Sequence, residues 1–240
     1  MAYPQIGISF ASVQHLKGLG LEFKDNFSDG SIFWAWRCEY LGEQQGLIEE
    51  GGLLKVFLTG VNQNYYWGKE YEGNGCPKVF VGVPGYPCEI IAKLSALTLA
   101  VNTQSGLFIS ALPRSLNEFN YMGIVRRKEA DFDGVCVVLH GERVAWLSQD
   151  DITTLPLWLK IRIGNFSDGS SHIIFSYSID GVNWLPAVGE EWIDYDSADE
   201  LYSMNLSAGL FSSNYFIRPG DKNNCAGHFD SFKIKVISKD

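Results

Sequence analysis

Short β-prone runs separated by turn sequences recur along the chain, and this pattern constrains the fold more than any other feature. Hardly any stretch keeps a helical spacing of apolar residues for more than two turns. Turn sequences such as Ser-Asp-Gly at 28–30 and Pro-Gly at 84–85 separate the runs. Strands at intervals of roughly 8–12 residues predict two antiparallel sheets packed face to face. The runs expected to form strands are 32–41, 52–59, 78–83, 89–101, 106–112, 119–127, 134–140, 143–148, 157–164, 171–179, 206–213 and 228–237.

Two of these runs indicate which side chains face the interior. In 228–237, Phe232 and Ile234 alternate with serine and lysine, and in 157–164 leucine and isoleucine alternate with Trp158 and two basic residues. Because successive side chains of a strand point to opposite faces, the apolar sets are expected to face the core. Trp158 is then expected on the outward face, where it can cover a neighbouring strand or serve as a platform for a ligand.

Length and charge narrow the class of protein. The 240 residues suffice for one large all-β domain, and we expect a sandwich over 21–240 that follows an arm or edge strand at 1–20. The formal net charge of −9 argues against nucleic-acid binding, which requires a basic face. No apolar run reaches the roughly 18 residues of a membrane span, and no export signal is visible at the start. The expected location is therefore cytoplasmic, with a virion or non-classical export as alternatives.

The cysteines do not form a recognisable site. They are Cys38, Cys76, Cys88, Cys136 and Cys225, and no two of them form a C-x-x-C pair. A zinc ribbon or a thioredoxin-type motif is therefore excluded. Cys76 and Cys88 flank a strand-like run and could form a bridge, but the odd number of cysteines favours free thiols.

Common catalytic signatures are absent from the sequence. It contains no nucleophile elbow, P-loop, dinucleotide fingerprint or zincin helix. Its four histidines are isolated, with no partner at the spacing of metal ligands. The sequence therefore favours a non-catalytic protein that requires no cofactor.

The order of several motifs resembles a known superfamily. The motifs are D-x-F at 25–27, YYWG at 65–68, S-x-D-G-x-x-W at 178–184 and FDSF at 229–232. Over about residues 21–237 the chain is similar to the concanavalin A-like lectin/glucanase superfamily. Within it, the chain resembles the C-terminal sandwich domains of bacterial β-xylosidases and the small "regulation of enolase" proteins. The resemblance implies an antiparallel jelly roll, a fold that carries lectins, hydrolases, carbohydrate-binding modules and virion proteins.

The resemblance also implies two kinds of site. Many sandwiches of this superfamily hold a structural calcium ion, for which Asp25 and Asp230 are the matching ligands; ordinary hydrogen-bonding carboxylates are the alternative. Glucanases of this fold carry their catalytic carboxylates as Glu-x-Asp-x-Glu on one strand, a motif that this chain lacks. Its nearest approach is Glu190 and Asp194, with Trp192 in place of the central aspartate. An acidic, solvated loop is the simpler interpretation of this segment.

Carbohydrate binding requires less than catalysis does, because flat aromatic faces beside hydrogen-bonding groups suffice. Polar and aromatic residues gather in the segment 62–71, where they can support the core or bind a ligand. The expected function is therefore non-catalytic, lectin-like carbohydrate binding. The residues expected to bind the glycan are Asn64, Tyr66, Trp67, Tyr71, Trp158 and Trp192.

Two other functions remain open at this point. A structural or assembly role, such as that of a virion surface or decoration protein, fits the low-charge residues 1–20, which could dock on a second copy of the chain. A glycoside hydrolase of lectin fold would have to use Glu190 and Asp194. The expected partner is a glycan or, for a homo-oligomer, another copy of the chain; neither nucleic acid nor a membrane is expected.

Overall fold

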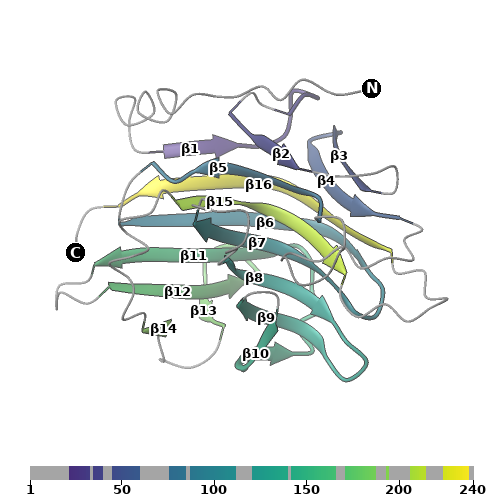
Figure 1. The fold of residues 1–240 in the computed structure, drawn as a ribbon, viewed down its shortest axis with the longest axis vertical. Helices are drawn as coiled ribbons and strands as arrows, with labels where there is room; N and C mark the ends of the chain where they lie inside the picture. Colours follow the sequence, from purple (N-terminus) through teal and green to yellow (C-terminus); the bar gives the residue numbers. More distant parts are fainter. Residues whose placement is uncertain are drawn as a thin grey trace.

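A computed structural model describes residues 22–32, 35–39, 45–59, 76–84, 87–111, 121–139, 142–165, 171–187, 193–194, 206–214 and 224–237. Within these ranges every regular element is a β-strand, and the strands form two layers (Figure 1). None of the described residues belongs to a helix long and apolar enough to span a membrane.

The larger layer, sheet A, has the strand order β13-β12-β11-β6-β16-β4-β3, with β1 beside β16 and β14 beside β12. Every pairing in it is antiparallel. Its strands are β1 (Glu22–Asp25), β3 (Gln45–Glu50), β4 (Leu53–Leu58), β6 (Cys88–Leu99), β11 (Leu157–Asn165), β12 (Ser171–Ser178), β13 (Leu185–Pro186), β14 (Ile193–Asp194) and β16 (Cys225–Val236).

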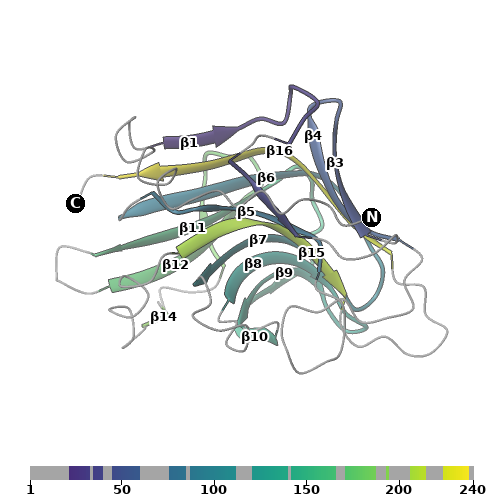
Figure 2. The same cartoon turned by 45° about the horizontal axis from the view of Figure 1, so that its top comes forward.

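The second layer, sheet B, has the order β10-β9-β8-β7-β15-β5-β2 and is antiparallel as well. Figure 2 shows that β7, β8, β9 and β15 bend along their length. The strands of sheet B are β2 (Arg37–Glu39), β5 (Lys78–Gly82), β7 (Thr103–Ala111), β8 (Tyr121–Lys128), β9 (Asp133–Leu139), β10 (Glu142–Asp150) and β15 (Leu206–Asn214). The predicted all-β sandwich of two antiparallel sheets is confirmed.

The core lies between the two sheets and follows the alternation in the sequence. Leu157 and Ile161 in β11 are fully buried, as are Phe232 and Ile234 in β16. Leu210 of β15 lies in the same cluster and so joins sheet B to it. The inward faces predicted for these two runs are therefore correct, because a period of two places one apolar set against the opposite sheet.

Aromatic side chains close the sandwich near its N-terminal strand. The Trp36 ring meets the Phe23 ring edge to face at 5.4 Å and the Phe232 ring at 4.8 Å between centroids. The Trp36 indole N–H donates a 2.7 Å hydrogen bond to Oδ2 of Asp25. Such a bond allows a large buried ring to keep its polar group satisfied.

The cysteines in the described residues are all unbridged, so Cys76 and Cys88 do not form a disulfide. Burial raises the pKa of Cys88, Cys136 and Cys225 to about 12. These three thiols are therefore protonated near neutral pH and behave as small apolar groups of the interior.

The hairpin after β12 is held by one aspartate. Asp180 accepts hydrogen bonds from the backbone N–H groups of Val182 and Asn183 at 2.8 and 2.7 Å, and from the Ser178 hydroxyl at 2.8 Å. Gly181 follows with φ of 75° and lies directly against the Trp158 ring, where an added Cβ would be 2.9 Å from a ring carbon. The turn predicted at Asp180 and Gly181 is thus present.

These hydrogen bonds hold the pKa of Asp180 well below its ordinary value, and the two from backbone N–H groups have the largest effect. A carboxylate with a lowered pKa stabilises the fold fully above its unfolded pKa of about 3.9, and that contribution is lost as the pH falls toward the folded pKa. We therefore expect Asp180→Asn to lower the melting temperature by a constant amount above about pH 5 and by a shrinking amount below about pH 4. Thermal unfolding of both proteins from about pH 2.5 to 7 measures this, and a difference independent of pH would contradict it.

Candidate functional site

The side of sheet B that faces away from the core carries its own apolar cluster. Phe80 of β5, Phe108 of β7 and Phe211 of β15 belong to it, and the Phe108 and Phe211 rings meet edge to face at 5.7 Å. Every residue of β15 is buried, so this strand is covered on both faces. A strand buried on both faces requires a continuous run of small or apolar residues, which is what LSAGLFSSN provides.

A polar row crosses the same face. We use this name for Ser213, Gln104, Arg127, Glu129 and Arg143. Gln104 of β7 lies directly opposite Ser213 on one side and Arg127 of β8 on the other. Directly opposed residues in neighbouring strands point to the same face, so the sheet register itself brings these three side chains together.

Hydrogen bonds and ion pairs connect the polar row without a break. The Gln104 amide donates to the Ser213 hydroxyl oxygen at 3.0 Å, and Arg127 Nη1 donates to Gln104 Oε1 at 3.1 Å. Arg127 Nε and Nη2 both lie 2.7 Å from Glu129 Oε1. Arg143 Nε of β10 lies 3.0 Å from Glu129 Oε2. Each charged member thus has a partner of opposite charge, which is the condition for burying such groups.

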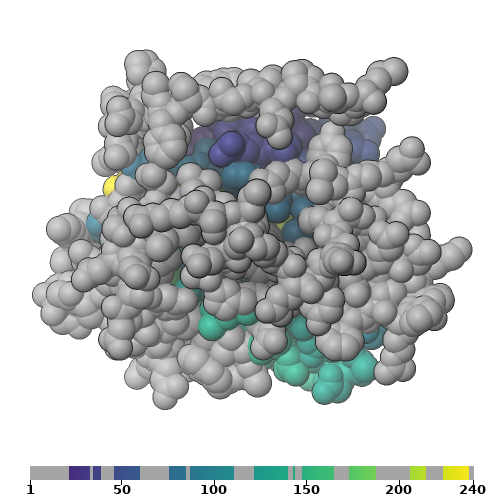
Figure 3. Space-filling view, in the orientation of Figure 1, coloured from purple at the N-terminus to yellow at the C-terminus, as the bar shows by residue number. Residues whose placement is uncertain are grey.

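The polar row runs from the interior to the surface. Arg127 is 5% exposed, whereas the Glu129 and Arg143 side chains are 16% and 26% exposed. The Arg143 guanidinium also lies over the Phe132 ring, with its central carbon 4.5 Å from the ring centroid. In the space-filling view, green atoms of the segment around β9 and β10 reach the surface (Figure 3). The accessible end of the row is therefore the end with Arg143.

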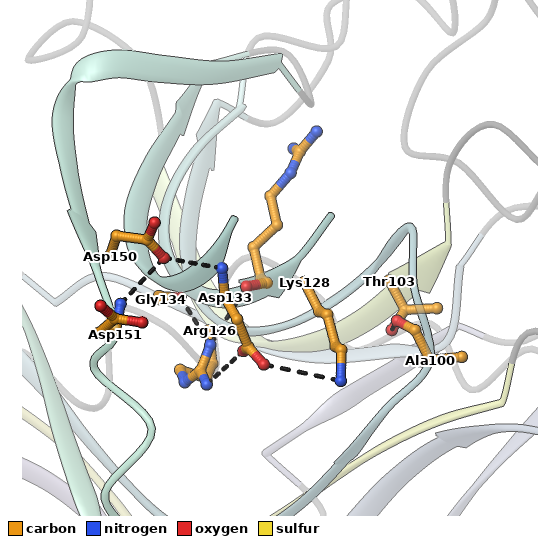
Figure 4. A network of polar contacts seen from close by, with 9 residues as sticks. Ala100, Thr103, Arg126, Lys128, Asp133, Gly134, Asp150 and Asp151 are labelled. Carbon is orange, nitrogen blue, oxygen red and sulfur yellow. Dashed lines mark hydrogen bonds and ion pairs between the residues drawn. The ribbon is translucent and has the colours of Figure 1, made fainter. Parts of the chain in front are cut away.

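A second network fixes the turn that carries Glu129 and Phe132. Arg126, on the other face of β8, donates from Nη2 to Asp133 Oδ1 at 2.6 Å and from Nη1 to the Gly134 carbonyl at 2.9 Å (Figure 4). The Asp133 backbone N–H donates to Asp150 Oδ1 at 2.9 Å, which ties β9 to the end of β10. Within the turn, the Glu129 N–H donates to the Phe132 carbonyl at 2.7 Å. The Glu129 carboxylate and the Phe132 ring thus project from a braced turn.

The chemistry available on this face is that of hydrogen bonding and charge recognition. Among the described outward side chains of sheet B and its turns, Glu129 is the carboxylate in the polar row, and both of its oxygens are engaged by arginines. Glycoside hydrolysis uses two carboxyl groups about 5–9.5 Å apart, one to protonate the leaving group and one to act as nucleophile or base. The amide, the hydroxyl and the Arg127 guanidinium are buried and bonded to one another, so the partly exposed Arg143 guanidinium is the group of the row placed to bind a polar ligand.

Trp158 is one of the few sequence-based candidates that the described residues include. It lies on the outer face of sheet A in β11, half-buried, with Gly181 against its ring and the Lys93 ammonium 5.1 Å from the ring centroid. Asp194 belongs to β14, where its backbone pairs with His172. The remaining candidates lie outside the described residues; they are Asn64, Tyr66, Trp67, Tyr71, Glu190 and Trp192.

The two carboxylates implied as calcium ligands point to opposite faces of sheet A. Asp25 is directly opposite Phe232 and has both oxygens engaged on the core side, by the Phe27 N–H at 2.8 Å and the Trp36 indole. Asp230 forms an ion pair with Lys93, which alternates with buried residues of β6 and so faces outward. A register irregularity in β16 next to Asp230 turns this side chain away from the core. As placed, the two residues do not fit one shared cation site.

The polar row was not among the residues expected from the sequence to bind a ligand. A signal for it exists, because Arg126 and Arg127 interrupt the apolar run 119–127 and Gln104 precedes another such run. Charged residues inside a buried strand require partners. The identity of those partners depends on strand register, which the sequence does not show.

Comparisons with known proteins identify the fold. No protein-family model and no curated protein matches the sequence. Among solved structures, a xylan β-1,4-xylosidase of Bacillus halodurans C-125 matches with a TM-score of 0.59 and 16% identity over 88% of this chain and 38% of that one. A GH43 protein of Bacillus licheniformis matches with a TM-score of 0.61 and 21% identity over 89% of this chain and 39% of that one. The chain therefore spans about two fifths of the length of these two proteins.

A shorter protein matches over its whole length. It is the immunostimulatory antigen and pseudo β-1,3-glucanase of Mycobacterium tuberculosis, with a TM-score of 0.51, 12% identity and coverage of 91% of this chain and 100% of that one. At these identities the likenesses show the fold alone. Together with the two antiparallel sheets, they show that the chain has the two-sheet antiparallel β-sandwich fold of the matched regions, the fold that the resemblance of its motifs implied.

Proposed function

We propose that the chain is a carbohydrate-binding β-sandwich without hydrolytic activity, and that the ligand binds at the accessible end of the polar row. The observation that carries the proposal is the row itself, a connected set of hydrogen-bonding side chains on the outward face of sheet B. Sugars are recognised by directional polar groups together with flat apolar surfaces. Arg143, supported by the buried Phe132 ring beneath it, supplies such a polar group at the end that reaches solvent.

The state of Glu129 supports binding rather than hydrolysis. Each of its oxygens is held by an arginine, so the carboxylate acts as a bridge between Arg127 and Arg143. A general acid or a nucleophile needs an oxygen within reach of the glycosidic bond. The similar structures include part of a xylan β-1,4-xylosidase and a pseudo β-1,3-glucanase, which supports a function related to carbohydrates.

The proposal is tested by affinity electrophoresis in gels that contain one polysaccharide each, from a panel of neutral and acidic plant and bacterial polysaccharides. We expect wild-type protein to be retarded by at least one of them, without release of reducing sugar from it. Trp158→Ala serves as the variant on the opposite sheet and is expected to be retarded like wild type. Circular dichroism confirms that the variant is folded.

Three outcomes would contradict the proposal. Absence of retardation in every gel would exclude carbohydrate binding. Loss of retardation in folded Trp158→Ala would move the site to the outer face of sheet A. Release of reducing sugar that disappears in Glu190→Gln or Asp194→Asn would identify the chain as a hydrolase.

A further inference from the structure

Arg143 is a partly exposed cation that is held in one orientation on the outward face of sheet B. Its Nε is fixed by Glu129 Oε2 at 3.0 Å, and its guanidinium plane lies over the Phe132 ring. Among the described residues, the ion pair found for Arg143 is the one from its Nε atom to Glu129. The two terminal nitrogens therefore project from an already positioned guanidinium whose side chain is 26% exposed.

Within the polar row, the positive and negative charges are unequal in number. Glu129 is shared with Arg127, so the polar row carries two positive charges and one negative charge. Asp150 is another carboxylate whose titration Arg143 affects, and it accepts the backbone N–H groups of Asp133 and Asp151, both at 2.9 Å. These two hydrogen bonds are the main causes of the lowered pKa of Asp150, and the positive charge of Arg143 is a smaller one. The polar row itself thus carries an excess positive charge in a chain with a formal net charge of −9.

A guanidinium with a free edge matches a carboxylate in geometry. Its parallel N–H groups can donate to both oxygens of a planar carboxylate, and such charge-assisted pairs are roughly twice as strong as neutral hydrogen bonds. A dense polyanion would be repelled by the negative charge of the whole chain, whereas a single carboxylate on a neutral glycan would not. The Phe132 ring beneath the guanidinium keeps it rigid, so little side-chain entropy is lost on binding.

We propose that Arg143 recognises the carboxylate of a uronic acid residue within an otherwise neutral glycan. The inference rests on the proposed carbohydrate-binding function and names the class of sugar that the same site selects. Arg143 contacts the ligand, Glu129 is a positioning residue that fixes its Nε, and Phe132 supports the guanidinium plane. Arg127 and Gln104 anchor Glu129 from the interior.

The test uses calorimetric titration with glucuronoxylan oligosaccharides and with the same oligosaccharides after reduction of their carboxyl groups to alcohols. We expect wild type to bind the acidic form at least about tenfold more tightly, with a preference that weakens at high salt. Arg143→Gln should bind both forms alike. Arg143→Lys keeps the charge but lacks the parallel N–H groups of the guanidinium, and it should retain part of the preference for the acidic form.

Arg37→Gln is the matched control, because Arg37 also lies over a phenylalanine ring of sheet B, that of Phe80 at 5.7 Å. It should keep the full preference for the acidic form. Equal binding of both forms by wild type would overturn the inference and leave carbohydrate binding intact. A preference that persists in Arg143→Gln, or tighter binding of a sulfated heparin oligosaccharide, would overturn it too, and no binding of any glycan would overturn both proposals. Thermal unfolding shows whether each variant is folded.

Discussion

Gly209→Ala is expected to destabilise the sandwich by at least about 4 kcal/mol, at the extreme of what single substitutions do. Gly209 lies in β15 between Phe80 of β5 and Phe108 of β7. A Cβ at this position would overlap the Val79 carbonyl oxygen and would lie 2.7 Å from the Phe80 Cα. Both obstacles are backbone atoms, which cannot rotate away as a side chain can. Relief would require β15 to separate from β5, and hydrogen bonds of sheet B would be lost.

Gly51→Ala provides the control for the added methyl group. Gly51 lies on the turn between β3 and β4 with φ of 62°, and a Cβ added to it would have no other atom within 4 Å. Alanine there meets conformational strain of about 1 kcal/mol but no steric obstacle. Urea denaturation followed by circular dichroism measures both variants. Similar unfolding midpoints for Gly209→Ala and wild type would show that β15 is less constrained than the structure indicates.

Much of the fold follows from local patterns. The alternation in 157–164 and 228–237 predicted the buried faces of β11 and β16, because a strand bounded by solvent and core must separate its side chains by polarity. The predicted strand at 89–101 corresponds to β6, Cys88–Leu99. In these segments the pattern of polar and apolar residues is enough to predict the strand and its buried face.

Two errors in the predicted strands have physical reasons. The run 32–41 suggested one long strand, whereas its described regular part is β2, Arg37–Glu39, since Trp36 turns into the core instead of continuing the ladder. Strand β3 at Gln45–Glu50 was missed because QGLIEE lacks a β-prone run. It forms because the Gly51-Gly52 turn, with φ of 62° and 78°, reverses the chain direction and lets β3 pair with β4.

The candidate site was much less predictable than the fold. The hydrogen bond between Gln104 and Ser213 joins residues 109 positions apart, and the one between Arg127 and Gln104 joins residues 23 positions apart. Only the register of three strands makes them neighbours, and a shift of one residue would place them on opposite faces. Similarly, alternation back from Phe232 would place Asp230 on the core side, and the irregularity in β16 reverses this.

Arg127→Met is expected to cost about 3–5 kcal/mol, because Glu129 Oε1 and the buried Gln104 amide lose the guanidinium that donates to them, while Arg143 stays paired with Glu129 Oε2. Arg127 is 5% exposed and holds both Glu129 Oε1 and Gln104 Oε1. Adding Glu129→Leu should recover part of the loss, since the carboxylate oxygen that Arg127 engaged is then removed. A double-mutant cycle by urea denaturation should give a coupling energy of roughly 2 kcal/mol between Arg127 and Glu129.

The exposed pair Lys233 and Glu22 is the control for this cycle. Its atoms are 2.9 Å apart, similar to the buried pair, but its side chains are 35% and 44% exposed. Exposed pairs contribute less than about 1 kcal/mol and weaken in salt, whereas a buried pair is poorly screened. If both cycles give the same small, salt-sensitive coupling, the polar row is hydrated and Glu129 cannot hold Arg143 rigidly. A larger, salt-insensitive coupling for Arg127 and Glu129 means that the interior of sheet B fixes the guanidinium presented at its surface.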